Sequence, residues 1–160
     1  MHAFRIPSVL ALVASLGLLG CGDLATPPSL DELGPEFFVI LRPAVIPVSI
    51  DIKPGSDPNC FNDDGHGVIP VAILGSADFD VLDVEPGTVQ LAGLSVKVRG
   101  KANKLLAHYE DVNGDGFIDL VLQIEDVAGT FASGNGIATL TGQLFDGTPI
   151  AGSDDICIVP

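Results

Sequence analysis

A short acidic stretch of the chain spaces its oxygen-bearing side chains at near-regular intervals. The side chains stand at positions 1, 3, 5 and 9 of a loop, as Asp111, Asn113, Asp115 and Asp119. Calcium takes about six to eight oxygen ligands from carboxylates, side-chain amides and backbone carbonyls. Three carboxylates would bring three negative charges to one divalent ion, and without a cation they would repel one another. The spacing therefore predicts a calcium site.

The backbone of the same loop fits this interpretation. Gly116 at position 6 permits a sharp turn, and Phe117 at position 7 can offer its backbone carbonyl as a further ligand. The loop matches the first two-thirds of an EF-hand and then departs from it, because Leu122 stands at position 12 where an EF-hand has a bidentate Glu. The alternative is a metal-free turn, since Asn-Gly and Asp-Gly dipeptides favour hairpin turns without any ion.

The elements that position this loop have the period of strands. Residues 105–109 and 118–124 are rich in apolar, β-branched and aromatic residues, and Leu120, Leu122 and Ile124 occupy alternate positions. The loop thus resembles the Asp-x-Asp-x-Asp-Gly-x-x-Asp calcium loops set in β-hairpins of integrin-type repeats. It also shares its first six positions with dockerin loops. This resemblance implies calcium held on a hairpin rather than between two helices.

Short strand patterns separated by turns make up most of the remaining chain. The 19 Gly and 12 Pro residues punctuate runs such as Val48–Ile52, which alternates, and Val68–Leu74, which is almost continuously apolar. Pro70 inside the second run favours an edge strand or a bulge. Roughly seven to nine strands and no convincing amphipathic helix predict an all-β fold. We expect an antiparallel β-sandwich, immunoglobulin-like in architecture.

The N-terminal residues have the pattern of an export signal. Residues 1–20 contain a short positively charged start and an apolar run from Ser8 to Leu19, too short to span a bilayer comfortably. The run ends in Leu-Leu-Gly-Cys, which resembles a bacterial lipobox and predicts lipidation of Cys21. An ordinary secretory signal is the alternative. Residues 21–44 then form a Pro-containing tether, residues 45–160 form the folded module, and we expect anchoring at the outer membrane or cell surface.

The charge of the chain restricts its partners. The 21 acidic residues outnumber the 7 Lys and Arg residues, and the formal net charge is -14. Nucleic acid is therefore not an expected partner, because phosphate binding needs a basic face. The chain has no Trp and a single Tyr, Tyr109. It accordingly offers no obvious aromatic platform on which a sugar ring could stack.

Three cysteines suggest two separate roles. If Cys21 carries lipid, Cys60 and Cys157 remain as a pair in an oxidising compartment. A bridge between them would close a loop of about 100 residues and join the first loop of the module to its last strand. Two free thiols are the alternative, and the even number in an exported chain favours the disulfide.

Several longer segments resemble a β-rich module of secreted and surface proteins of environmental bacteria. The segments are Ile50-Asp-Ile-Lys-Pro-Gly-Ser56, Gly67-Val-Ile-Pro-Val-Ala-Ile-Leu-Gly-Ser76, Asp111–Leu120 and Asp146-Gly-Thr-Pro-Ile150 leading to Gly152-Ser-Asp154. This resemblance implies a non-enzymatic, accessory or structural role. We expect a protein or polysaccharide as partner, and the sequence does not name it. It also implies calcium binding by the acidic loop, which the spacing indicates independently.

Two further possibilities follow from the abundant acids. A carboxylate pair such as Glu110 and Asp126 could serve a hydrolase, and a carbohydrate- or polymer-binding module is a third class of function. No Ser/His/Asp, Cys/His or His-Glu-x-x-His pattern supports an enzyme. The loop at residues 57–67, with Asp63, Asp64 and His66, lacks the regular spacing of the acidic loop, and we interpret it as a solvated turn.

Overall fold

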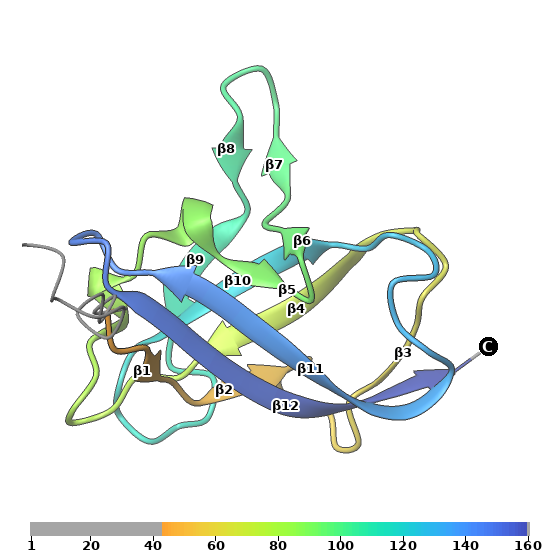
Figure 1. Cartoon of the computed structure of the whole chain (residues 1–160), viewed down its shortest axis with the longest axis horizontal. Coiled ribbons are helices and arrows are strands. Elements are labelled where there is room, and N and C mark those ends of the chain that lie inside the picture. The colour runs from red at the N-terminus through yellow and green to blue at the C-terminus, as the bar shows by residue number, and fades with distance from the viewer. Residues whose placement is uncertain (1–42, 160) are drawn as a thin grey trace, which may run out of the picture. The chain divides into compact units, whose positions relative to one another are not determined.

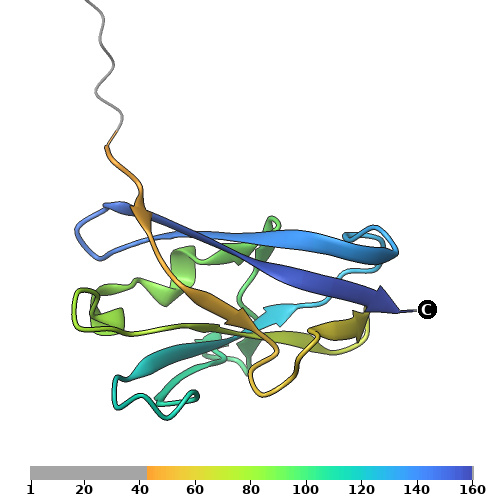
Figure 2. The same cartoon turned by 90° about the horizontal axis from the view of Figure 1, so that it is seen from below.

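Two β-sheets pack face to face in residues 43–159, the part of the chain that the computed structural model describes (Figures 1 and 2). The first sheet runs in the order β1 (Ile46–Pro47), β12 (Pro149–Val159), β11 (Gly134–Gln143), β5 (Gln90–Leu91) and β6 (Leu94–Ser95), and β3 (Cys60–Asn62) also pairs with β12. The second runs in the order β2 (Ile50–Ile52), β4 (Val68–Ile73), β10 (Asp119–Glu125) and β9 (Ala107–Glu110). The expected all-β sandwich is confirmed.

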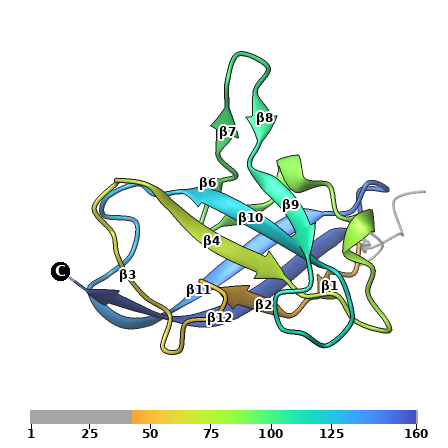
Figure 3. The same ribbon diagram turned by 180° about the vertical axis from the view of Figure 1, so that it is seen from behind.

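A separate hairpin, β7 (Val98–Arg99) with β8 (Lys104–Leu105), extends away from both sheets (Figures 1 and 3). Two short 3₁₀ turns, η3 (Val81–Asp83) and η4 (Pro86–Thr88), connect β4 to β5. No helix in residues 43–159 is long and apolar enough to cross a membrane. The predicted signal peptide, the lipidation residue Cys21 and nearly all of the predicted tether lie outside the described residues.

Alternation along the strands places the core between the two sheets. In β11, Leu140 is fully buried and Ala138 nearly so, whereas Ile137 is 71% exposed. In β10, Leu120, Leu122 and Ile124 are fully buried and belong to the same apolar cluster. A strand directs successive side chains to opposite faces, so the alternation seen in the sequence becomes one packed face per sheet.

The strand count differs from the seven to nine expected, because residues 43–159 contain twelve strands. Five of the twelve have only two residues: β1, β5, β6, β7 and β8. Pieces this short carry little alternation, so hydrophobic periodicity detects them poorly, although β5 and β6 lie where strands were expected around Ala92-Gly93. Most pairings are antiparallel as expected, but β12 pairs in parallel with both β1 and β3.

Pro70 lies in an interior strand, not at an edge, because β4 pairs with both β2 and β10. Its carbonyl accepts the hydrogen bond of Lys53 N at 2.7 Å, just where β2 ends and the chain turns at Lys53 with φ 61°. The N and C=O of one residue in an antiparallel pair face the same neighbouring strand. The nitrogen of Pro70 therefore faces Lys53, whose carbonyl accepts the N–H of Ser56 instead, so the missing N–H leaves that carbonyl paired.

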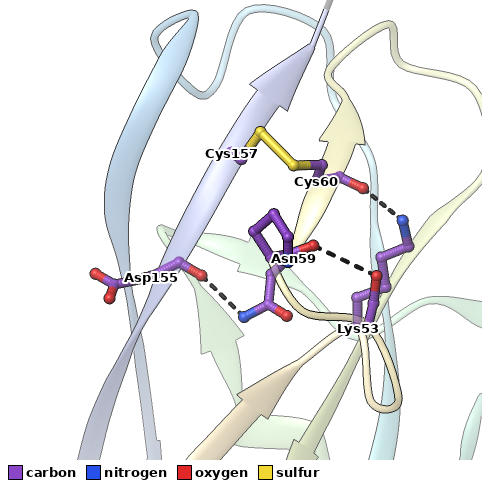
Figure 4. The surroundings of a disulfide bond; sticks show 7 residues. Lys53, Asn59, Cys60, Asp155 and Cys157 are labelled. Atoms are coloured by element: carbon purple, nitrogen blue, oxygen red, sulfur yellow. Dashed lines mark hydrogen bonds between the residues drawn. A yellow bond between two sulfur atoms is a disulfide. The ribbon is translucent and has the colours of Figure 1, made fainter.

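The predicted disulfide between Cys60 and Cys157 is present (Figure 4). The two residues are direct partners in the parallel pair of β3 and β12, with Cα atoms 4.3 Å apart. Neighbouring hydrogen bonds hold both strands: Cys157 N donates to the Asn59 carbonyl, the Asn59 amide donates to the Asp155 carbonyl, and Lys53 Nζ donates to the Cys60 carbonyl. The bridge thus reinforces a join between two strands 97 residues apart in sequence.

Candidate calcium loop

The acidic loop connects β9 to β10 at one end of the second sheet. Glu110 and Asp119 are register partners, so residues 111–118 form the loop of this antiparallel hairpin. The strand flanks expected from the sequence are therefore confirmed. Gly114 and Gly116 have positive φ values of 75° and 90°, conformations that a residue with a Cβ adopts only at a cost.

Asp111 organises the turn through both of its carboxylate oxygens. Oδ1 accepts the N–H of Gly114 at 2.7 Å, and Oδ2 accepts the N–H of Gly116 at 3.0 Å. An Asp side chain that accepts backbone N–H groups further along the chain stabilises a turn. Asp111 therefore has a structural role, which is to stabilise the turn of the loop.

Asn113 and Asp115 continue the same pattern. Asn113 Oδ1 accepts the N–H of Asp115 at 3.0 Å, and Asp115 Oδ1 accepts the N–H of Phe117 at 2.8 Å. The Asn113 amide also donates to Asp115 Oδ2 at 2.9 Å, which brings positions 3 and 5 of the loop together. Asn113 and Asp115 are exposed to solvent.

Asp119 differs from the other acids because its side chain is completely buried. Its Oδ1 accepts the N–H of Gly75 at 2.8 Å, and its Oδ2 accepts the N–H of Val112 at 2.9 Å. A buried carboxylate is costly unless its oxygens are hydrogen-bonded, and here both are. Asp119 thereby joins the start of the loop to the chain that leaves β4.

Gly75, which has no role in the acidic pattern, is required at this junction. A Cβ on Gly75 would collide with the backbone carbonyl of Ile118. Only glycine lets the two backbones approach closely enough for Gly75 N to reach Asp119. The spacing of the acids gave no indication that Gly75 takes part in this junction. The available signal was the Gly75-Ser76 pair at the end of the long apolar segment.

The oxygen atoms of the loop are of the types that bind calcium. Their side chains, however, are not already gathered around one point. Carboxylate, amide and carbonyl oxygens are the ligands that calcium takes, and Asp111, Asn113, Asp115, Phe117 and Asp119 supply them. A carboxylate has about four lone-pair sites, so the hydrogen bonds above leave capacity for a cation. Within residues 43–159, however, no three His, Cys, Asp or Glu side chains are grouped so that they could hold a metal ion.

A second, partly buried link joins the two sheets through Asp154. Asp154 lies on the inward face of β12, and its Oδ2 accepts the N–H of Ile52 at 2.8 Å and the Asn59 amide at 3.0 Å. The adjacent Gly152 has no room for a side chain, because a Cβ there would meet the carbonyl of Val48. Sequence spacing did not indicate either contact.

These acids affect the ionisation of Asp51 in β2. Partial burial, followed by the negative charges of Asp154 and Asp119, raises the pKa of Asp51 above its ordinary value. The folded state therefore binds the Asp51 proton more tightly than the unfolded state does. Ionisation of Asp51 costs stability, and that cost grows as pH rises from about 3.8 through the raised pKa.

Replacement of Asp51 by Asn should therefore raise the melting temperature at pH 7. The gain should shrink as pH falls and disappear below the pKa of the unfolded carboxyl, where the wild-type residue is protonated in both states. Thermal melts from pH 3 to 8 measure this. Asp146 is the matched control, because the Thr148 N–H lowers its pKa, and Asp146→Asn should destabilise the protein at neutral pH. A gain from Asp51→Asn that is equal at pH 3 and 7 would contradict the interpretation.

The segment at residues 57–67 is only partly the solvated turn expected, because β3 occupies Cys60–Asn62 and pairs with β12, and only residues 63–67 form the bend that leads to β4. Asp64 accepts the Asn62 amide and the N–H of His66, and Asp63 Oδ2 accepts the N–H of Phe131 at 2.9 Å. His66 lies 3.4 Å from Asp64, with its side chain 89% exposed. These contacts account for Asp64 and for one oxygen of Asp63, while Asp63 Oδ1 and Asp126 Oδ1 are buried without a hydrogen-bond partner among the described residues.

Glu110 and Asp126 do not form the carboxylate pair considered for a hydrolase. Glu110 is the register partner of Asp119, and Asp126 follows the opposite end of β10. From Asp119 to Asp126 the strand rises by seven residues at ~3.3 Å each, so the two ends of β10 lie about 23 Å apart. Paired carboxylates in glycoside hydrolases lie about 5–9 Å apart. This candidate is wrong because the strand between the two acids is extended.

Comparison with protein families, with curated proteins and with solved structures finds no match for the chain.

Proposed function

We propose that this chain is an exported, calcium-stabilised domain with a non-enzymatic structural or binding role at a bacterial surface. The observation that carries the proposal is the hairpin loop from Asp111 to Asp119, which holds four oxygen-bearing side chains and one carbonyl of suitable type in nine residues. The carboxylates of Asp111 and Asp115 already accept the loop's own N–H groups, so their oxygens lie along one short, tight turn.

The buried Asp119 supports a structural role for the ion. Any cation bound by the loop would add to the same junction that Asp119 makes with Gly75 and Val112. Asp111, Asn113, Asp115, the Phe117 carbonyl and Asp119 would hold the ion. When bound, calcium would offset the repulsion among the carboxylates and cross-link the loop, which stabilises the folded state alone.

The proposed location rests on residues 1–21 and on the disulfide. A lipid on Cys21 would anchor the domain to a membrane through the tether, and the Cys60–Cys157 bridge suits an oxidising, exported environment. Fractionation of bacteria that express the full chain tests this location, because an anchored lipoprotein belongs to the membrane fraction. A carbohydrate- or polymer-binding role remains the second candidate.

Calcium should raise the melting temperature of the protein, and EDTA should lower it. At a calcium concentration 100 times the dissociation constant, linkage adds about 2.7 kcal/mol to the free energy of unfolding, or about 10 °C for a domain of this size. Asp115→Ala should abolish the response, because it removes one carboxylate of the loop. Differential scanning calorimetry with and without calcium measures both.

Asp146→Ala is the matched control for this experiment. Asp146 accepts the Thr148 N–H in another hairpin turn, much as Asp115 accepts the Phe117 N–H, so both variants lose a backbone hydrogen bond of this kind; Asp115→Ala also loses the bond from the Asn113 amide. Only Asp146→Ala should keep the calcium response. Melting curves of the wild-type protein that coincide in calcium and EDTA would refute the calcium proposal and favour the metal-free turn.

A further inference from the structure

The positive charge of this acidic chain is concentrated in one place. Four of its seven Lys and Arg residues fall within eight positions, at Lys97, Arg99, Lys101 and Lys104. None of its 21 acids lies between residues 86 and 109. We name residues 97–104 the basic arm. Such segregation is unusual for a surface that only needs to stay soluble, because mixed charges serve that purpose.

The basic arm projects from the sandwich as the hairpin of β7 and β8 (Figures 1 and 3). Arg99, Lys101 and Lys104 are exposed. Val98 in β7 pairs with Leu105 in β8, and Leu105 packs against the core. Each strand of the hairpin extends about three residues from the sandwich. At ~3.3 Å per residue, the turn lies roughly 10 Å from the base of the hairpin. That exceeds the screening length of about 8 Å at physiological salt, so the tip is largely screened from the acidic body.

The charges of the basic arm are not neutralised within the domain. Arg99 and Lys104 are direct partners across β7 and β8, and like charges opposite each other destabilise a strand pair. Among the described residues, the ion pairs within 4 Å are His66–Asp64 and His108–Glu110, and neither includes a Lys or Arg. An external anion would relieve this repulsion.

A cavity at the base of the basic arm gives an anion a place to bind. It has a volume of about 380 Å³ and is lined by Arg99, Lys104, His108 and Gln123 together with the apolar residues 105–107. Guanidinium and ammonium groups bind carboxylates by charge-assisted hydrogen bonds, and an amide side chain can donate to a hydroxyl or carboxylate. The cavity thus combines positive charge with the polar groups that recognise an acidic sugar.

We propose that the basic arm and its basal cavity bind an acidic polysaccharide through the carboxylate groups of successive sugar residues. One charged sugar would occupy the cavity beside Arg99 and Lys104, and the next charges along the polymer would contact Lys101 at the turn. A polymer fits better than a single small anion, because the cations are distributed along the hairpin. This inference identifies the ligand class for the binding role proposed above and relies on that proposal only for the extracellular setting.

Other anionic partners fit the basic arm less well. The turn Gly100–Asn103 carries no large apolar side chain to insert into a bilayer, and the strongly acidic body would repel nucleic acid, whose charge density is high. A second copy of this domain would bring its own excess of acids close to those of the first. An extended polyuronate can reach the arm alone, with its charges spaced one per sugar.

Binding of the full chain to polygalacturonate, measured by titration calorimetry in EDTA, tests the proposal. EDTA prevents calcium from bridging polymer and protein. We expect binding that weakens from 50 to 300 mM NaCl and that is lost when the polymer is methyl-esterified, which removes charge without changing the backbone. Arg99→Gln with Lys104→Gln should weaken binding by about tenfold or more, a loss of about 1.4 kcal/mol or more. Lys53→Gln, which removes a cation outside the arm, should not.

Several outcomes would overturn the proposal. These are no binding, equal binding to the esterified polymer, equal binding by the Arg99 and Lys104 variant, or a preference for duplex DNA or anionic phosphatidylglycerol vesicles. Sedimentation of the protein alone as a salt-sensitive dimer that the same variant abolishes would assign the arm to a second copy instead. Circular dichroism checks that each variant is folded in EDTA. The calcium response of the double variant should be intact, so failure here is distinct from failure of the calcium proposal.

Discussion

Replacing both Cys60 and Cys157 by Ala is expected to lower the free energy of unfolding by about 4–5 kcal/mol. The bridge closes a segment of 97 residues, and chain-entropy estimates for a loop of about 100 residues give this value. For a domain of this size the melting temperature should fall by about 15–20 °C. Denaturant unfolding of the wild-type and variant chains measures the difference. The loss is large because the disulfide mainly restricts the unfolded chain, and β3 and β12 are already neighbours in the folded state.

Reduction of the wild-type protein is the matched control, because it breaks the same bond without changing the sequence. It should reproduce most of the loss seen in the double variant. A titration of free thiols in denatured, unreduced protein carrying Cys21→Ser should find none. Two free thiols would show that the bridge does not form in solution. A variant as stable as the wild-type protein would show that the strand pairing alone holds Cys60 beside Cys157.

Asp119→Ala is expected to cost about 2–4 kcal/mol, even in EDTA. The substitution leaves the buried N–H of Gly75 and the partly buried N–H of Val112 without an acceptor, and an orphaned buried donor costs about 1–3 kcal/mol. Asp119→Asn should cost less, because its remaining oxygen can still accept one of the two N–H groups. Chemical denaturation measures the loss. Amide exchange should locate it, since the Gly75 N–H should lose its protection first.

Asp115→Ala provides the comparison from the same loop. Asp115 is exposed, and its backbone acceptor role is confined to the Phe117 N–H, which water can replace. In EDTA this variant should therefore lose well under about 1 kcal/mol. If Asp115→Ala and Asp119→Ala were equally destabilising in EDTA, the buried junction with Gly75 would not be the source of the Asp119 effect.

The segments that resemble the bacterial module meet in the folded domain. Gly75 of the second segment donates to Asp119 of the acidic loop, and Ile52 of the first segment donates to Asp154 of the last. Through these contacts, Gly75, Ile52 and their partners have structural roles that do not depend on any ligand. These segments therefore contribute to the packing of the sandwich. The basic arm lies outside all four segments.

Much of the fold could be predicted because its signals are local. The alternating residues of β10 and the apolar run of β4 predict buried strands, and both are buried. The hairpin around the acidic loop was predicted for the same reason, since its turn dipeptides and strand flanks are contiguous. Among the two-residue strands, β5 and β6 lie where strands were expected around Ala92-Gly93, whereas β7 and β8 fall in a stretch interpreted as a turn. β1 depends on a distant partner, because Ile46 pairs with Ile150.

The acidic loop shows most clearly where local pattern ends and tertiary structure begins. Spacing alone decides that Asp111, Asn113 and Asp115 share one tight turn, because neighbouring residues cannot separate. Spacing could not distinguish Asp119 from the others, although Asp119 is buried and bound to a glycine 44 residues earlier. That difference arises from the close approach of two backbones, which only the packed sandwich creates. The same holds for the basic arm, whose Arg99 and Lys104 become opposite neighbours only when β7 and β8 pair.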